Sequence, residues 1–386
     1  MTARGRALAI LTGLAVFVAG WVVFVARWSG PAGAGPNQAG MRVAGAQATG
    51  LGAFRGQVLI WAFGGFTERE VGLVRDSTRV ATISAVRTRQ LPVASTRRGY
   101  RAVPMEAMAV DPGAYAAAVG RPGVKLTGQL EKGVVLSRTG AKLRHLQAGG
   151  LLRLAGHRPL RVGGVVDDVL LGGYEAAMDS DLARRYGIST ASYLLVKPRG
   201  PRQDFEVAMR GLLLGRPIRF RDPDDQQFLR GGNGGLPLGL VKVRFGEFAV
   251  PSLHRGQPDP AWTRANIVTR DLPVLGRVSC HRLVIDDLAA AMADLQQQRL
   301  GGLVDAADFQ RRGGCWSRRL QREGDGRLSR HAWGIAVALN VAANPPGRRP
   351  VTDQRLVKAM ARHGFTWGGR WLRPYGGHFE WVGAGA

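Results

Sequence analysis

The first apolar pattern along the chain is a run of twenty residues without a charge, residues 7–26. A helix rises about 1.5 Å per residue, so this run spans roughly 30 Å, the thickness of a bilayer core. Arg4 and Arg6 precede the run, as the positive-inside rule expects for a cytoplasmic N-terminus, although Arg27 follows it. The pattern predicts a transmembrane anchor over residues 1–27, with the rest of the chain exported.

A cleaved signal peptide is the alternative for the same segment. Its apolar region would normally be shorter, about 7–15 residues, and would end at a small-x-small site. Phe24 makes Phe24-Val-Ala26 a poor site, and Ala32-Gly-Ala34 lies beyond the usual distance from the start of the chain. The pattern therefore favours a single-pass protein of the cell membrane with its C-terminal part extracytoplasmic, and a secreted protein is the alternative.

The next pattern is a change from a Gly/Ala/Pro-rich tether to short apolar runs. Residues 28–54 have the composition of a flexible linker. Over residues 55–240, apolar runs alternate with turn residues, and this spacing favours a strand-rich fold. Two segments, around Leu143 and over 174–186, interrupt the runs with helical patterns. The runs lie at residues 58–62, 80–86, 134–136, 151–154, 160–162, 165–166 and 193–196.

Part of this region has a recognisable order of segments. Gly133-Val-Val-Leu-Ser137 is followed by a helical pattern, by Gly149-Gly150 and by Leu160-Arg-Val-Gly-Gly-Val-Val166. This order is similar to extracytoplasmic β-rich domains attached to transporters. His145 and His157 stand singly among charged and apolar neighbours, as surface or structural histidines do. A binding or spacer role is therefore expected of the β-rich domain.

A Gly-rich joint at 231–239 leads to a second domain, which we place at 243–386. Helical periodicity marks residues 285–300, where one face carries three apolar side chains, those of Leu288, Met292 and Leu295. A second helix is predicted over 354–363, and Gly364 is its stop signal. The segments between and after these helices have the pattern of strands and loops, which predicts an α+β domain.

The charge of the chain is strongly positive. Lys and Arg number 54 and Asp and Glu number 28, which gives a net charge of +26. Such a charge attracts polyanions, among them anionic lipid head groups and anionic wall polymers. The basic residues are spread along the chain, without a nucleic-acid-binding motif or a compact cluster of arginines and aromatic residues. Nucleic acid is therefore not expected as a partner.

The two cysteines, Cys280 and Cys315, both lie in the second domain. A secreted domain with two cysteines usually joins them. A disulfide between Cys280 and Cys315 would stabilise the fold by roughly 3–4 kcal/mol on the chain-entropy model. The alternative is a pair of buried free thiols.

Three motifs follow near the C-terminus: Ser329-Arg-His331-Ala-Trp-Gly334-Ile-Ala336-Val-Ala338-Leu-Asn340, Gly364-Phe-Thr-Trp367-Gly-Gly369-Arg-Trp371, and His378-Phe-Glu380. Together they resemble the zinc D-alanyl-D-alanine carboxypeptidase family of bacterial cell-wall enzymes, the VanY-like peptidases and phage endolysins. The family pattern is Ser-x-His-x-x-Gly-x-Ala-x-Asp, then Gly-Phe-x-Trp-Gly-Gly-x-Trp, then Asp-x-x-His-Phe. The resemblance implies a fold of the D-Ala-D-Ala peptidase/hedgehog type for residues 243–386, and peptidoglycan stem peptide as the partner.

The resemblance also assigns roles to individual positions. His331 and His378 fall on two of the three zinc ligands, and zinc would acidify the attacking water. The third ligand, an Asp in the family, falls on Ala338. The family's general base falls on Tyr375, whose phenol is a far weaker base than a carboxylate at neutral pH. Arg319 falls on the arginine that grips the substrate's terminal carboxylate.

Two replacements at catalytic positions leave three interpretations open. The first is a degenerate peptidase domain that binds peptidoglycan or regulates a wall process. Such a domain would bind zinc weakly or not at all. The second is an active zinc carboxypeptidase or endopeptidase in which Glu380, on the same side of an extended strand as His378, acts as ligand or base; Asn340 shares a side with Ala338 in the same way. The third is an adaptor in which the β-rich domain does the binding.

Overall fold

The computed structural model describes residues 54–222, 228, 230–231, 235–253, 257–317 and 328–383. The expected anchor over 7–26, all but the last residue of the expected linker over 28–54, and Arg319 lie outside the described residues. Within the described ranges, no helix is long and apolar enough to cross a membrane.

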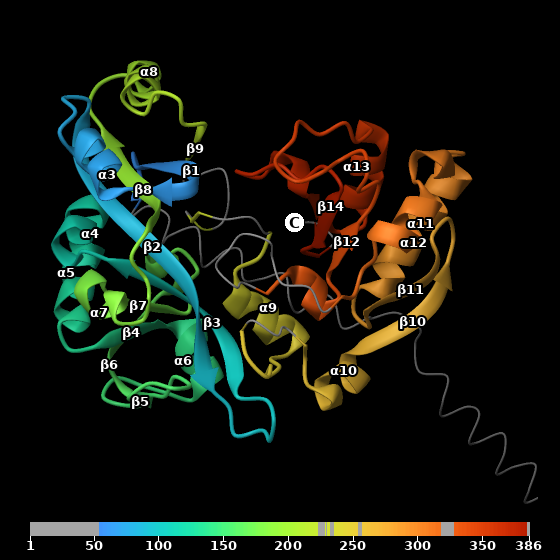
Figure 1. The fold of residues 1–386 in the computed structure, drawn as a ribbon, viewed down its shortest axis with the longest axis horizontal. Helices are drawn as coiled ribbons and strands as arrows, with labels where there is room; N and C mark the ends of the chain where they lie inside the picture. Colours follow the sequence, from blue (N-terminus) through green and yellow to red (C-terminus); the bar gives the residue numbers. More distant parts are fainter. Residues whose placement is uncertain are drawn as a thin grey trace, which may run out of the picture. The chain divides into compact units, whose positions relative to one another are not determined.

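The first part of the described chain is built on a nine-stranded mixed sheet (Figure 1). Its strands are β1 (Val58–Phe66), β2 (Val80–Ala94), β3 (Ala102–Val110), β4 (Val134–Ser137), β5 (Leu151–Leu152), β6 (Leu160–Val166), β7 (Ala176–Asp179), β8 (Ala191–Pro198) and β9 (Ile218–Arg221). Their order in the sheet is β5-β6-β4-β7-β3-β2-β8-β1-β9. The pairs β3–β7 and β4–β6 are parallel, and the other neighbouring pairs are antiparallel.

Short helices accompany this sheet and give it a mixed α/β character. They are α3 (Glu68–Arg75), α4 (Pro112–Val119), α5 (Arg121–Leu130), α6 (Arg138–Arg144), η3 (Asp168–Leu171), α7 (Ser180–Arg184) and α8 (Arg202–Leu212). Local sequence explains where several begin. Thr67 and Glu70 form a reciprocal capping box at α3, and the Asp111 side chain accepts a hydrogen bond from Ala114 N at α4. The helical pattern around Leu143 is confirmed as α6.

The prediction of a helix over 174–186 is wrong in its first half. Residues Ala176–Asp179 form β7, which lies between β3 and β4, and only the short helix α7 follows it. Ala176, Ala177 and Met178 are fully buried and their backbone pairs with strands on both sides. Alanine favours a helix by itself, but a central position in a sheet overrides that preference.

The second part of the described chain contains two smaller sheets. Strands β10 (Ile267–Leu272) and β11 (Gly276–His281) form a hairpin, and β12 (Ala336–Ala338), β13 (Phe365–Trp367) and β14 (His378–Trp381) form a three-stranded antiparallel sheet in the order β12-β14-β13 (Figure 1). The helical segments are α9 (Leu238–Phe245), α10 (Pro260–Asn266), α11 (Ile285–Gln297), η5 (Gly301–Leu303), α12 (Ala306–Arg312), η6 (Arg330–Trp333), α13 (Gln354–Arg362) and η7 (Gly368–Arg370).

The two predicted helices of this part are confirmed as α11 and α13. Leu288, Met292 and Leu295 of α11 are completely buried in the core that also holds the inner face of the three-stranded sheet. Helix α13 begins after Asp353, whose side chain accepts a hydrogen bond from Arg355 N, and the chain turns at Gly364 with φ of 84°. These helices therefore hold the strands that carry the C-terminal motifs.

Candidate functional site

The three-stranded sheet brings the motif residues together by its register. Ala338 pairs with His378, and Ala336 pairs with Glu380, across β12 and β14. Alternate residues of a strand share a face, so these four side chains lie on one face of the sheet. The residues between them, Val337 and Phe379, point into the hydrophobic core. The sheet therefore has one face that packs on the core and one face that carries His378 and Glu380.

His331 approaches this face from η6. Ser329 caps η6 by accepting a hydrogen bond from His331 N at 3.3 Å. The His331 Nδ1–H donates to the carbonyl oxygen of Cys315 at 2.7 Å, so the lone pair of the neutral ring lies on Nε2. Cys315 is itself joined to Cys280, which confirms the predicted disulfide. The disulfide therefore fixes the carbonyl that orients His331.

His378 lies beside His331, with ring centroids 5.0 Å apart. Its Nε2 is 3.3 Å from Glu380 Oε1, and its Nδ1 is buried without a hydrogen-bond partner. The Tyr375 ring stacks on the His378 ring at 5.3 Å, and the Trp371 ring is tilted against it at 4.9 Å. Each histidine thus has one nitrogen held by an oxygen, which is the arrangement that usually orients a metal-ligating imidazole.

The third ligand position is where the site departs from a zinc centre. Ala338 is fully buried, and its methyl group cannot bind a metal. In the described ranges, no three His, Cys, Asp or Glu side chains come together as a metal-binding group. A protein zinc site needs at least three protein ligands. The described residues therefore provide two oriented imidazoles but do not fit a three-ligand zinc site.

Asn340 does not replace the missing ligand. Its backbone is left-handed, with φ of 50°, so the chain has left the extended strand that ended at Ala338. The Asn340 amide is committed elsewhere, because it accepts from Asp305 N at 2.8 Å and donates to Leu303 O at 2.7 Å. The idea that Asn340 shares the ligand face with Ala338 is therefore wrong.

Glu380 is buried and both of its carboxylate oxygens are engaged. Oε1 meets His378 Nε2, and Oε2 accepts a hydrogen bond from Gly235 N at 2.7 Å. Burial raises the pKa of Glu380, but the hydrogen bond and charge of His378, with the charge of Arg330 and the Gly235 N–H, leave that pKa below its ordinary value. Glu380 is consequently an ionised carboxylate that orients His378.

The remaining motif residues divide between core and site. Trp333 is fully buried and donates its indole N–H to Gly246 O, and Phe365 belongs to the same core. Trp367 donates to Gly376 O at 2.7 Å and so shapes the loop that carries Tyr375. These three aromatic residues thus form part of the framework of the site, whereas Trp371 and Tyr375 contact His378 directly.

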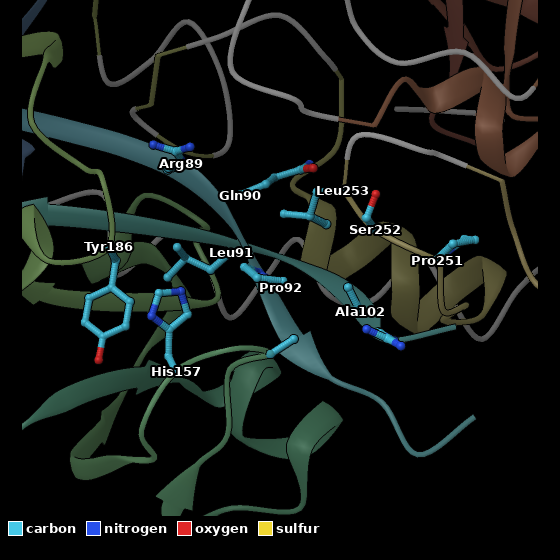
Figure 2. Close-up of a pocket in the computed structure, with 12 residues that line it drawn as sticks. Arg89, Gln90, Leu91, Pro92, Ala102, His157, Tyr186, Pro251, Ser252 and Leu253 are labelled. Atoms are coloured by element: carbon cyan, nitrogen blue, oxygen red, sulfur yellow. The ribbon is translucent and has the colours of Figure 1, made fainter. Parts of the chain in front are cut away.

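A cavity of about 410 Å³ lies apart from these residues, between β2 and the segment 251–253 (Figure 2). Arg89 and Arg101 line it and have no carboxylate partner in the described part of the chain. The side chains of His157 and Tyr186 lie side by side in its wall (Figure 2). Their ring centroids are 4.9 Å apart. No sequence pattern predicts this cavity, because its walls come from segments far apart in the chain.

The sequence patterns also do not single out Arg330 as a site residue, because the family pattern allows any residue at its position. Its side chain is buried, donates to Leu236 O at 2.9 Å, and lies 3.9 Å from Glu106 of β3. Leu328 N, nearby in the chain, donates to the side-chain oxygen of Gln90 at 3.0 Å. The segment that carries His331 is therefore attached to the large sheet through two buried polar contacts.

Comparison with known proteins shows what the C-terminal motifs are similar to. The D-alanyl-D-alanine carboxypeptidase family model matches residues 323–381, a range that includes both histidines, Ala338 and Tyr375. The match supports a carboxypeptidase-like domain at the C-terminus. No curated protein matches the chain.

Two of the solved structures that resemble this chain align with less than half of its length. The periplasmic region of MacB from Actinobacillus actinomycetemcomitans is 15% identical, with a TM-score of 0.33, and the alignment covers 46% of this chain and 94% of that chain. The extracellular domain of the noncanonic ABC-type transporter YknZ from Gram-positive bacteria is 11% identical, with a TM-score of 0.31, and the alignment covers 43% of this chain and 98% of that chain.

Proposed function

We propose that this protein is an exported, peptidoglycan-directed protein whose carboxypeptidase-like domain binds stem peptide without hydrolysing it. One observation carries the proposal: the position directly across the sheet from His378 is a buried methyl group, that of Ala338. A two-imidazole site holds zinc weakly, so no activated water is expected. Residues 7–26 would anchor the protein in the membrane, and its net charge of +26 would favour anionic wall polymers or lipid head groups.

The position of the family's general base supports the same conclusion. Tyr375 lies flat against His378, with an angle of 27° between the rings. A phenol in this place is a poor proton acceptor at neutral pH, and loss of a general base alone costs about 10²–10⁴ in rate. A stacked aromatic ring instead offers an apolar wall, which suits a site that binds a peptide.

Zinc analysis and a cleavage assay on the full-length protein test the proposal. We expect less than stoichiometric zinc after dialysis against a zinc buffer, no release of D-alanine from muropeptides, and measurable binding of a pentapeptide that ends in D-Ala-D-Ala. Stoichiometric zinc together with sustained release of D-alanine would show that the domain is an active peptidase.

An active enzyme is the second candidate, and one observation favours it. Glu380 is ionised and lies 3.3 Å from His378, so a carboxylate is present on the ligand face. If Glu380 served as ligand or base, Glu380→Gln would abolish turnover while leaving the fold intact. Turnover that is unchanged in this variant would exclude Glu380 from catalysis.

A further inference from the structure

We infer that Glu380 and Arg330 form a subsite that binds the backbone of an extended peptide, and that the chain's own segment Gly235–Pro237 occupies it. Gly235–Pro237 is called the strap below. The inference deepens the proposed function, because a peptide from outside must compete with the strap for the same two side chains.

The strap presents one donor and one acceptor from consecutive residues. Gly235 N–H donates to Glu380 Oε2 at 2.7 Å, and Leu236 O accepts from Arg330 Nη2 at 2.9 Å. Both bonds join a charged side chain to a backbone group, and such bonds are stronger than bonds between neutral groups. No strap side chain takes part in them, so the subsite recognises a peptide backbone rather than a particular sequence.

The two side chains are buried, whereas exposure along the strap falls from exposed Gly235 through half-buried Leu236 to buried Pro237. Glu380 is 2% exposed and Arg330 is 5% exposed, while Gly235 is exposed. A buried charged group needs hydrogen-bond partners, and losing one is costly. The Nε atom of Arg330 is already buried without a partner. When the strap leaves, the pair therefore requires another peptide backbone or water in its place.

Close packing explains why the strap has glycine at this position. A Cβ atom added to Gly235 would lie 2.6 Å from Val382 Cγ1 and 2.8 Å from Thr366 Cγ2, closer than carbon atoms approach. A bulky residue at 235 is therefore incompatible with the bound strap. The other end of the strap is buried at Pro237 and continues directly into α9, whereas Gly235 is exposed.

The strap is an intramolecular competitor. A tethered segment acts at an effective concentration that reaches the millimolar range for short connections. A stem peptide must consequently compete with the strap, which lowers its apparent affinity for the natural protein. The contacts predict a site that is closed at rest and that opens by release of the Gly235 end.

Titration of two variants of the full-length protein tests this inference. Gly235→Val should displace the strap and tighten binding of a fluorescent pentapeptide ending in D-Ala-D-Ala by at least about tenfold. Gly211→Val is the matched control, since a Cβ atom there meets nothing within 4 Å, and its affinity should equal that of the natural protein.

A synthetic peptide of residues 231–239 should bind Gly235→Val and compete with the pentapeptide. Arg330→Gln, added to Gly235→Val, should remove binding of both peptides while thermal unfolding remains cooperative.

Hydrogen exchange of the Gly235 amide in the natural protein is a second test, and it does not depend on the folding of a variant. Saturating amounts of either peptide should speed exchange of the Gly235 amide. If Gly235→Val binds the 231–239 peptide but not the pentapeptide, the subsite stands and the proposed wall-peptide function fails. If neither peptide binds and neither speeds exchange at Gly235, the subsite itself is refuted.

Discussion

Ala338 lies directly opposite His378 in the antiparallel pair of β12 and β14. Side chains in such positions have Cβ atoms about 4.5–5.5 Å apart and point to the same face. A carboxylate at position 338 would thus project beside the His378 ring, within reach of a metal shared with His331. The geometry of the sheet keeps the place of a third ligand although the residue there cannot act as one.

Restoring acids at the two replaced positions is therefore expected to create a metal site. Ala338→Asp combined with Tyr375→Asp should bind one zinc per chain, measured by elemental analysis and by competition with a chelator, and should release D-alanine from muropeptides. Ala336→Asp with Tyr375→Asp is the control, because position 336 lies opposite Glu380 and is equally buried. Equal zinc binding by both pairs would mean that the register of β12 and β14 does not define the ligand position.

Loss of the disulfide should destabilise the fold and loosen His331. Replacing Cys280 and Cys315 by Ala removes a cross-link between residues 35 apart, which lowers the free energy of unfolding by roughly 3–4 kcal/mol. Denaturant unfolding of the natural protein with and without a reductant measures the same difference. Because Cys315 O accepts the Nδ1–H of His331, the His331 ring resonances should also broaden or shift in the variant. A reductant-insensitive midpoint would show that the disulfide does not stabilise the protein.

Lys242 should contribute strongly to stability where α9 packs against the large sheet. Its ammonium group is completely buried, 2.8 Å from Glu175 and 3.3 Å from Glu247. Lys242→Met leaves the buried Glu175 with Arg144, at 3.3 Å, as its remaining charged partner and the Glu106 N–H, at 3.1 Å, as a hydrogen-bond donor, and should cost about 3–5 kcal/mol of unfolding free energy. Arg79→Met, which breaks an exposed pair with Asp204, should cost less than about 1 kcal/mol. Similar costs for the two variants would contradict this account.

His281 should make the protein less stable in mild acid. Burial, together with the charge of Arg282, lowers the pKa of His281 to about 4, whereas an unfolded histidine has a pKa near 6.5. The unfolded chain then binds the proton first, so stability is lost as the pH falls from about 6.5 to about 4, by about 3 kcal/mol in total. His281→Leu should flatten this part of the curve of unfolding free energy against pH, and exposed His145→Asn should leave it unchanged. A curve that is equally steep in His281→Leu would assign the acid sensitivity to other groups.

Much of the local structure of the second part follows from the sequence. The apolar faces and stop signals predicted α11 and α13, and the pairing of Cys280 with Cys315 was expected from their number and setting. The positions of His331 and His378 within the family pattern were enough to predict that they come together, and they do. Periodicity, capping residues and motif spacing act over a few residues, and for that reason they can be recognised in a single chain.

The tertiary structure decided which groups meet across long stretches of chain. Residues 176–179 became a strand because strands on both sides pair with them, against the preference of their alanines. Glu380 and Arg330 received their partners from the strap, 145 and 94 residues earlier in the chain, and Asn340 turned away from the site to bind Leu303 and Asp305. The sequence alone determined the frame of the site and its missing acids. Packing between remote segments determined what fills it, because contacts between distant residues depend on the register of strands and the approach of loops, which local patterns do not encode.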